Sequence, residues 1–179
     1  MSVVLDLVAT ALQVGIGILF VVAGGGKVTR WHEFKGTLDA YRLLPASLVR
    51  PAAGVIVVAE LVSGVALVSG WQAGPFAFLA SVMLACFAAG MAINLARGRH
   101  FIDCGCFQGA RQPIEWRLVV RNVVLALAAF ASSDYSMAAD DPQRWVQAAP
   151  AGVTVVVLYF ALSAVWALDT SRAAAFKRS

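Results

Sequence analysis

Five long runs of apolar residues constrain this chain more than any other feature of its sequence. Each is close to the roughly 20 residues that an α-helix needs to cross about 30 Å of hydrocarbon. Of the residues, 60% are hydrophobic and 13% are charged, whereas a soluble domain carries about 25% charged residues. We therefore predict an all-α integral membrane protein, a four-helix transmembrane bundle plus a fifth C-terminal transmembrane helix, in a single multi-pass domain. The predicted spans are residues 3–26, 51–70, 74–96, 114–133 and 146–168.

The basic residues are unevenly distributed along the chain. Of the 14 Lys and Arg residues, 13 follow the first, third or fifth span, and the connections after the second and fourth spans are uncharged or mainly acidic. Loops rich in Lys and Arg stay in the cytoplasm. We therefore predict an N-terminus outside and a C-terminus in the cytoplasm. Because this topology accounts for the net charge of +4, we expect the lipid bilayer, and no nucleic acid, as a partner.

Three local features have a predicted place in the membrane. The first span lacks a basic start and a small-residue cleavage site, so we interpret it as a retained helix, not a signal peptide. Residues 29–48 are partly amphipathic, and we expect them in the cytoplasmic interface with Trp31 and Tyr41 near the headgroups. Cys86, within the third span, is expected to be an apolar packing thiol.

Several polar residues fall inside the predicted spans. A lone carboxylate such as Glu60 is costly in hydrocarbon, by about 2.5–3.5 kcal/mol on insertion scales, so we expect it to be protonated or paired. The candidate partners are Lys27 and Arg121. Because Asn94 and Asn122 lie at similar depth, we predict one buried polar cluster of these five residues. Its role is either a packing lock, which we favour slightly, or a proton relay.

The tripeptide Cys104-Gly105-Cys106 is the most specific chemical signal in the chain. One interpretation is a dithiol that exchanges with a partner disulfide, since a small strained disulfide ring is easily reduced. Arg99 and His100 are cationic neighbours that could stabilise a thiolate, and Asp103 would oppose them or accept a proton. The second interpretation, a metal site, lacks a second ligand pair, so we predict no metal. The third is two buried structural thiols.

Several motifs resemble a known family. The chain is similar to the DoxX-like membrane superfamily in residues 17–27 (GILFVVAGGGK), 41–45 (YRLLP) and 59–64 (AELVSG). It is similar to the MauE branch, the methylamine utilisation proteins, in residues 97–99 (RGR), 103–107 (DCGCF), Trp116 and 121–122 (RN). The resemblance extends over about residues 12–127.

The resemblance implies a function. It implies a multi-pass protein of the bacterial inner membrane that works with a thioredoxin-like partner of the MauD type. Such proteins act in maturation of an exported, disulfide-rich client, the small subunit of methylamine dehydrogenase. It implies that Cys104 and Cys106 are the redox pair of a thiol–disulfide oxidoreductase. Two other functions remain open: a non-catalytic assembly factor or anchor with structural cysteines, and a bundle that binds a quinone or another small molecule around Glu60. We predict no cofactor; a quinone is compatible with the sequence but not indicated by it.

The charge distribution and the resemblance disagree on one point. The basic residues place the Cys104 loop on the cytoplasmic side, whereas an exported client matures outside. Either the loop enters the bilayer, packed against protein through apolar residues such as Phe101, Ile102 and Phe107, or the topology is inverted.

Overall fold

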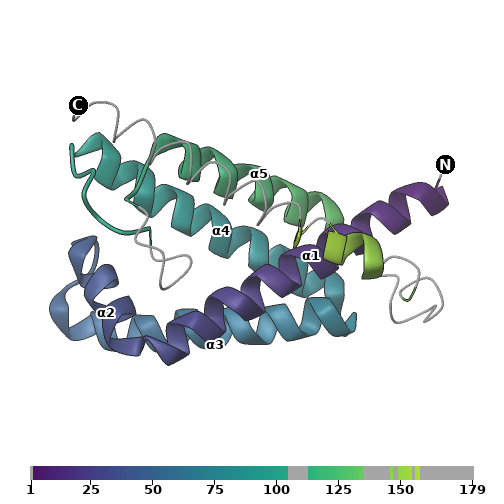
Figure 1. Ribbon diagram of the computed structural model, residues 1–179, viewed down its shortest axis with the longest axis horizontal. Helices are drawn as coiled ribbons and strands as arrows, with labels where there is room; N and C mark the ends of the chain where they lie inside the picture. Colours follow the sequence, from purple (N-terminus) through teal and green to yellow (C-terminus); the bar gives the residue numbers. More distant parts are fainter. Residues whose placement is uncertain (1, 105–112, 135–145, 147–148, 155, 158–179) are drawn as a thin grey trace, which may run out of the picture.

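The computed structural model describes residues 2–104, 113–134, 146, 149–154, 156 and 157, and it is helical throughout its main elements (Figure 1). The helices are α1 (Ser2–Thr29), α2 (Trp31–Ala40), α3 (Ala46–Ser69), α4 (Ala73–Ala96) and α5 (Trp116–Ser132). The predicted all-α architecture is confirmed. Most of the predicted fifth span, the acidic connection before it and Cys106 lie outside the described residues.

Helices α1, α3 and α4 are long and apolar enough to cross a membrane. Large apolar side chains point away from the protein along these helices and along α5, among them Val58 and Val65 on α3, Phe78 on α4 and Leu127 on α5. In water such a surface would be unfavourable, whereas hydrocarbon solvates it without cost. The protein is therefore an all-α integral membrane protein.

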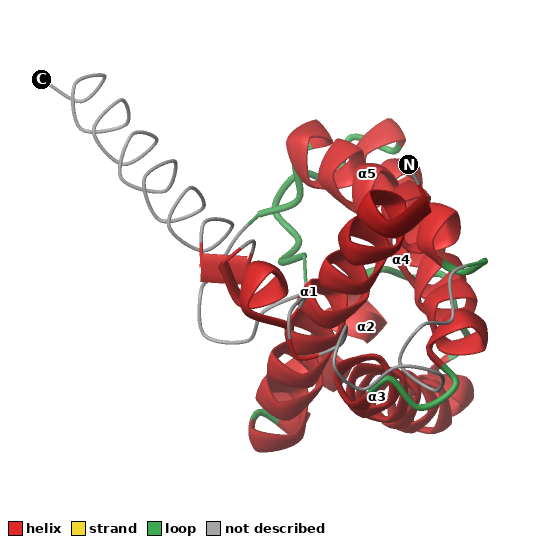
Figure 2. Ribbon diagram, turned by 90° about the vertical axis from the view of Figure 1, so that its right-hand side faces the viewer, coloured by secondary structure: helices red, strands yellow, loops and turns green. Residues whose placement is uncertain are grey.

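The four long helices form a bundle. Helix α1 packs against α3 and α5, and α4 packs against α3 and α5. Figure 2 looks along this bundle, with α1 crossing between α3 and α5. The long helices alternate in direction, so the end of α1, the start of α3, the end of α4 and the start of α5 meet at one end (Figure 1). Helix α2 lies at the same end, which we call the α2 end.

Helices α1 and α3 approach closely through glycines. A Cβ atom on Gly17 would lie 2.9 Å from the carbonyl oxygen of Gly64, and one on Gly64 would lie 2.9 Å from the carbonyl oxygen of Gly17. Without side chains at these two positions, the backbones come into contact, as small residues allow in membrane bundles. This contact fixes the register of α1 on α3, and with it the position of Lys27 relative to Glu60.

Helix α3 begins five residues before the predicted start of the second span. Pro45 caps its N-terminus in an extended conformation, and Pro51 lies inside the helix. A proline lacks the N–H group that would bond the carbonyl four residues earlier, here that of Ser47. In the second turn this loss is a single hydrogen bond, so the helix continues through Pro51.

One prediction about a single side chain is wrong, that for Cys86, and the depth of Tyr41 and Trp31 in the membrane stays a prediction. Tyr41 is buried in an apolar cluster with Met91, Leu95 and Ile114. Cys86 is exposed on the outer surface of α4, so it is not a packing thiol of the bundle. Trp31, which was predicted to lie near the headgroups with Tyr41, is half-buried against a cluster formed by Phe34, Ala53 and Val57.

Candidate functional site

The bundle contains a buried ion pair between α1 and α3. The Nζ atom of Lys27 lies 2.6 Å from Oε1 and 2.7 Å from Oε2 of Glu60, so the ammonium group donates to both carboxylate oxygens. Each side chain is 2% exposed. Of the two candidate partners that the sequence offered, the structure pairs Glu60 with Lys27. Each charge offsets part of the other's cost of leaving water, whereas either one alone would be buried uncompensated.

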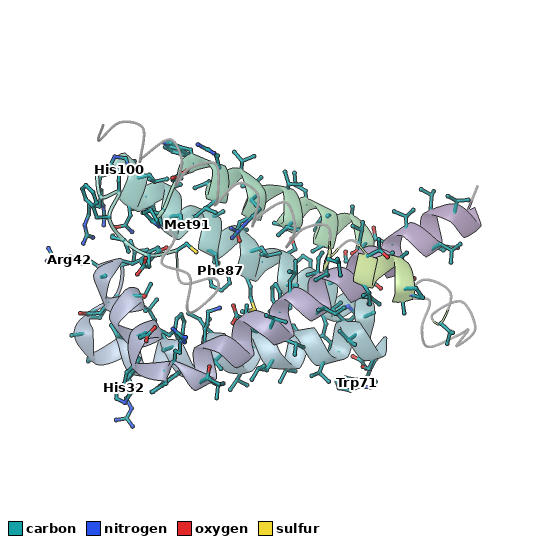
Figure 3. All side chains as sticks on the ribbon, viewed as in Figure 1. His32, Arg42, Trp71, Phe87, Met91 and His100 are labelled. Carbon is teal, nitrogen blue, oxygen red and sulfur yellow. The ribbon has the colours of Figure 1, made fainter. Side chains whose placement is uncertain are left out.

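Two aromatic rings complete the surroundings of Lys27. Its Nζ atom lies 5.4 Å from the ring centroid of Phe34 on α2 and 5.6 Å from that of Phe87 on α4. Both distances are within the range of about 6 Å in which a cation is attracted to a ring face. Figure 3 shows Phe87 on α4. Lys27 therefore joins four helices at one point, through Glu60 on α3 and a ring on each of α2 and α4.

A mostly apolar cavity lies next to the ion pair. The cavity is small, with a volume of about 40 Å³. Its polar lining comes from Glu60 on α3 and from Arg121 and Asn122 on α5. Asn122 is buried and donates through its amide nitrogen to the carbonyl oxygen of Leu118, at 2.8 Å. Three of the five residues predicted to form one polar cluster thus line a common cavity, and Lys27 is bonded to one of them.

Asn94 belongs to a second polar group. It is buried on α4, its side-chain amide donates to the carbonyl oxygen of Gly90 at 3.1 Å, and its Oδ1 atom accepts from Arg99 at 2.9 Å. Glu60 bonds with Lys27, whereas Asn94 bonds with Arg99 and its own helix. The predicted single cluster is therefore two groups, because the face of α4 that carries Asn94 turns toward Arg99 at the α2 end.

Arg99 connects α4 to the end of α2. Its guanidinium group donates to the backbone carbonyl oxygens of Ala40, at 2.8 Å, and Tyr41, at 3.4 Å, in addition to Asn94. A planar guanidinium with five N–H donors can satisfy several acceptors at once. Arg99 was predicted as a cation near the cysteines. In the structure it also holds the backbone at the end of α2.

Tyr41 connects the same group to the cysteine loop. Its hydroxyl group donates to the backbone carbonyl oxygen of Cys104, at 3.2 Å. The base of the loop is closed just before this point, because the N–H group of Ile114 donates to the carbonyl oxygen of Ile102 at 2.8 Å. Asp103 and Pro113 pair across the loop in an isolated bridge. The backbone of Cys104 is therefore held at the α2 end of the bundle, by Tyr41 at its carbonyl oxygen and by the loop base that precedes it.

The remaining predicted residues have less defined places. His100 is exposed after α4, and Figure 3 shows it at the edge of the molecule. Asp103 is half-buried at the loop base, and Cys106 lies outside the described residues. Among the residues that the structure describes, no three His, Cys, Asp or Glu side chains gather as metal ligands. Sequence reasoning missed the contacts of Phe34, Phe87 and Tyr41, because an aromatic residue in an apolar helix gives no signal of which neighbour it will meet.

Together, the fold and the site define an integral membrane helical protein with a charged pair inside its bundle and an anchored cysteine at one end. The family model of the methylamine utilisation protein MauE matches residues 5–133, and the chain belongs to this family. The resemblance to the MauE branch is thereby confirmed.

Three curated relatives are similar over most of their length. The methylamine utilization protein MauE of Paracoccus denitrificans is 37% identical over 172 residues, which cover 94% of this chain and 92% of the relative. That of Methylorubrum extorquens is 38% identical over 156 residues, covering 85% of this chain and 84% of the relative. That of Paracoccus versutus is 37% identical over 161 residues, covering 88% and 86%. No solved structure matches the chain.

Proposed function

We propose that this chain is a membrane accessory protein of methylamine utilisation that exchanges disulfides through Cys104 and Cys106. Its place in the MauE family supports the pathway. The observation that carries the chemistry is the anchoring of Cys104, whose backbone is held by Tyr41 beside a closed loop base. A cysteine that must meet a partner protein repeatedly in one geometry benefits from such a fixed backbone.

The proposed reaction transfers two electrons. A thiolate from one of the two cysteines attacks a disulfide in the partner, and the partner's S–S bond breaks as a mixed disulfide forms. The departing partner thiolate takes up a proton. The second cysteine then attacks the mixed disulfide, releases the partner as a dithiol and leaves a Cys104–Cys106 disulfide in this chain. The reverse sequence oxidises a partner dithiol. The partner proposed here is a thioredoxin-like protein, and the client an exported protein with disulfides.

The experiment replaces the cysteines in cells that depend on this chain for maturation of such a client. We expect Cys104→Ser, Cys106→Ser and the double variant each to abolish client maturation while the protein still inserts in the membrane. Cys86→Ser is the matched control, since it removes an exposed thiol on the outer surface of α4. With one loop cysteine replaced, the other should be trapped in a mixed disulfide with the partner. Normal maturation in the double variant would exclude the proposed reaction and favour an assembly factor with structural cysteines.

The topology is part of the proposal. We propose the α2 end as the cytoplasmic end, because Lys27, Arg30 and Lys35 gather there with the basic residues that follow α4. The membrane is proposed to be the bacterial inner membrane. The Cys104 loop then lies at the cytoplasmic end, so the partner must reach it from that side. Labelling of cysteines introduced at the two ends of the bundle with a membrane-impermeant reagent tests the assignment.

A further inference from the structure

The hydrogen bond from Tyr41 reaches a specific peptide group. The carbonyl oxygen of Cys104 accepts it at 3.2 Å, and this oxygen belongs to the peptide unit that joins Cys104 to Gly105. That unit lies inside the small ring that a Cys104–Cys106 disulfide closes. Because a peptide unit is planar and rigid, holding its oxygen holds the orientation of the whole unit. Tyr41 therefore acts on the backbone between the two sulfur atoms.

The Tyr41 hydroxyl is held in place by contacts besides the one with Cys104. Its ring is buried among residues of α4, the loop base and the start of α5, with 8% of the residue exposed. Arg99 fixes the backbone on which it stands, by donating to the carbonyl oxygens of Ala40 and Tyr41. Asn94 in turn orients Arg99 from within α4. The hydroxyl therefore does not simply follow Cys104 when the loop changes conformation.

The loop base restricts where such a change can occur. Ile102 and Ile114 are hydrogen-bonded across the base, both are buried, and Asp103 pairs with Pro113. These contacts hold the backbone up to Asp103 when a disulfide forms or breaks. The peptide unit after Cys104 is the first one that can turn, and it is the one that Tyr41 holds.

We propose that Tyr41 is a positioning residue that sets the dithiol–disulfide equilibrium of Cys104 and Cys106. The proposal rests on the proposed function, which assigns these two cysteines as the redox pair. Closing a ring across a single intervening residue requires the first peptide unit to adopt one orientation, whereas the dithiol leaves it free to turn. The Tyr41 hydroxyl stabilises whichever of the two states, dithiol or disulfide, points the Cys104 carbonyl oxygen toward it. It stabilises the other state less. The hydroxyl of Tyr41 thus biases the equilibrium constant.

The test measures that equilibrium without any partner protein. The full chain, purified in detergent with Cys86→Ala to leave two thiols, is equilibrated with mixtures of reduced and oxidised glutathione. The two loop thiols lose two electrons and two protons as their disulfide forms, and oxidised glutathione takes them up to give two reduced glutathione molecules. The oxidised fraction is read by alkylation and mass spectrometry. The variants are Tyr41→Phe, which keeps the ring, and Thr10→Val, which removes a different hydroxyl that bonds a backbone carbonyl oxygen, that of Asp6.

We expect Tyr41→Phe to change the equilibrium constant by about 2-fold to 12-fold, the range that one hydrogen bond typically contributes. Thr10→Val should leave it unchanged. Arg99→Lys should shift it in the same direction as Tyr41→Phe, and the two together should shift it by less than the product of the single effects, because they act through one contact. Thermal unfolding of each variant identifies any general loss of structure.

Each outcome decides one of the two proposals. Suppose that the oxidised fraction of Cys104 and Cys106 in the parent protein changes with the glutathione ratio, and that Tyr41→Phe leaves the equilibrium constant unchanged, as Thr10→Val does. Tyr41 then has no positioning role, and the proposed function is unaffected. If the parent pair forms no disulfide at any glutathione ratio, the proposed redox reaction is itself wrong. If Tyr41→Phe unfolds, the Arg99→Lys shift decides alone, since it loosens the backbone of Tyr41 and keeps both its ring and its hydroxyl.

Discussion

Lys27 on α1 and Glu60 on α3 form an ion pair in which both carboxylate oxygens accept from one ammonium group, at 2.6 and 2.7 Å, with each side chain 2% exposed. In a pair so deeply buried, removing either partner leaves the other charge uncompensated. Because Lys27 also faces Phe34 and Phe87, the pair holds α1, α2, α3 and α4 around one point.

The first prediction concerns the loss of one partner of this pair. Glu60→Gln leaves an ammonium group buried without its counter-charge, and such a loss typically costs about 3–5 kcal/mol of stability. We expect a lower thermal unfolding midpoint in detergent. Lys27→Met combined with Glu60→Leu should recover most of the loss, because two apolar side chains leave no charge behind. If the double variant is stable and client maturation continues, the pair is a packing lock; if maturation stops, the proton-relay role gains support.

A second prediction concerns the glycine contact between α1 and α3. Gly17→Ala would place a Cβ atom 2.9 Å from the carbonyl oxygen of Gly64, so the two helices must separate. We expect a loss of about 1–3 kcal/mol, as for other overpacked interiors. Gly25→Ala is the control on the same helix, since nothing lies within 4 Å of its Cβ position. Equal unfolding midpoints for the two variants would contradict the close approach of α1 to α3.

A third prediction concerns the orientation of the bundle in the membrane. His32 and Trp71 are both exposed and lie at opposite ends of the molecule (Figure 3). In a chain without its native cysteines, Trp71→Cys should react with a membrane-impermeant maleimide in intact spheroplasts, and His32→Cys should react only after lysis. The reversed pattern would show that the α2 end faces outward, which would place the Cys104 loop on the same side as an exported client.

The fourth prediction concerns Asn94. Asn94→Leu removes the acceptor for Arg99 at 2.9 Å and a bond to Gly90 in a site with no exposed surface. Leaving a buried donor without its partner typically costs about 1–3 kcal/mol. We expect a lower unfolding midpoint and faster alkylation of Cys104, because Arg99 then holds the Tyr41 backbone less firmly. Asn122→Leu is the comparison: it should alter stability but not the alkylation rate of Cys104, since Asn122 bonds within α5.

Some features of the fold and of the site could be predicted from the sequence alone. Hydropathy over about 20 residues reflects the solvent that a helix meets, so the all-α membrane architecture could be predicted from the chain alone. The carboxylate of Glu60 could also be predicted to need a partner, because an unpaired charge in hydrocarbon is unfavourable whatever the fold. The spacing of Cys104 and Cys106 is covalent, so it is the same whatever the fold.

The sequence could not show which way each helix turns about its axis. Helix α4 is apolar on all sides, so no periodicity distinguishes its inner from its outer face, and the expectation that Cys86 packs inside was wrong for this reason. Likewise, both Lys27 and Arg121 were within reach of Glu60, and only the register of α1 on α3, set by Gly17 and Gly64, selects Lys27.

Membrane insertion, the helical fold, the family and the pair of neighbouring thiols were therefore determined by the amino-acid sequence, because each depends on composition or on residues close together in the chain. The partner of Glu60, the separate group around Asn94 and the hold of Tyr41 on Cys104 were decided only by the tertiary structure. Each of those contacts joins residues from different helices or loops, and their distances depend on helix rotation and packing that local patterns do not encode.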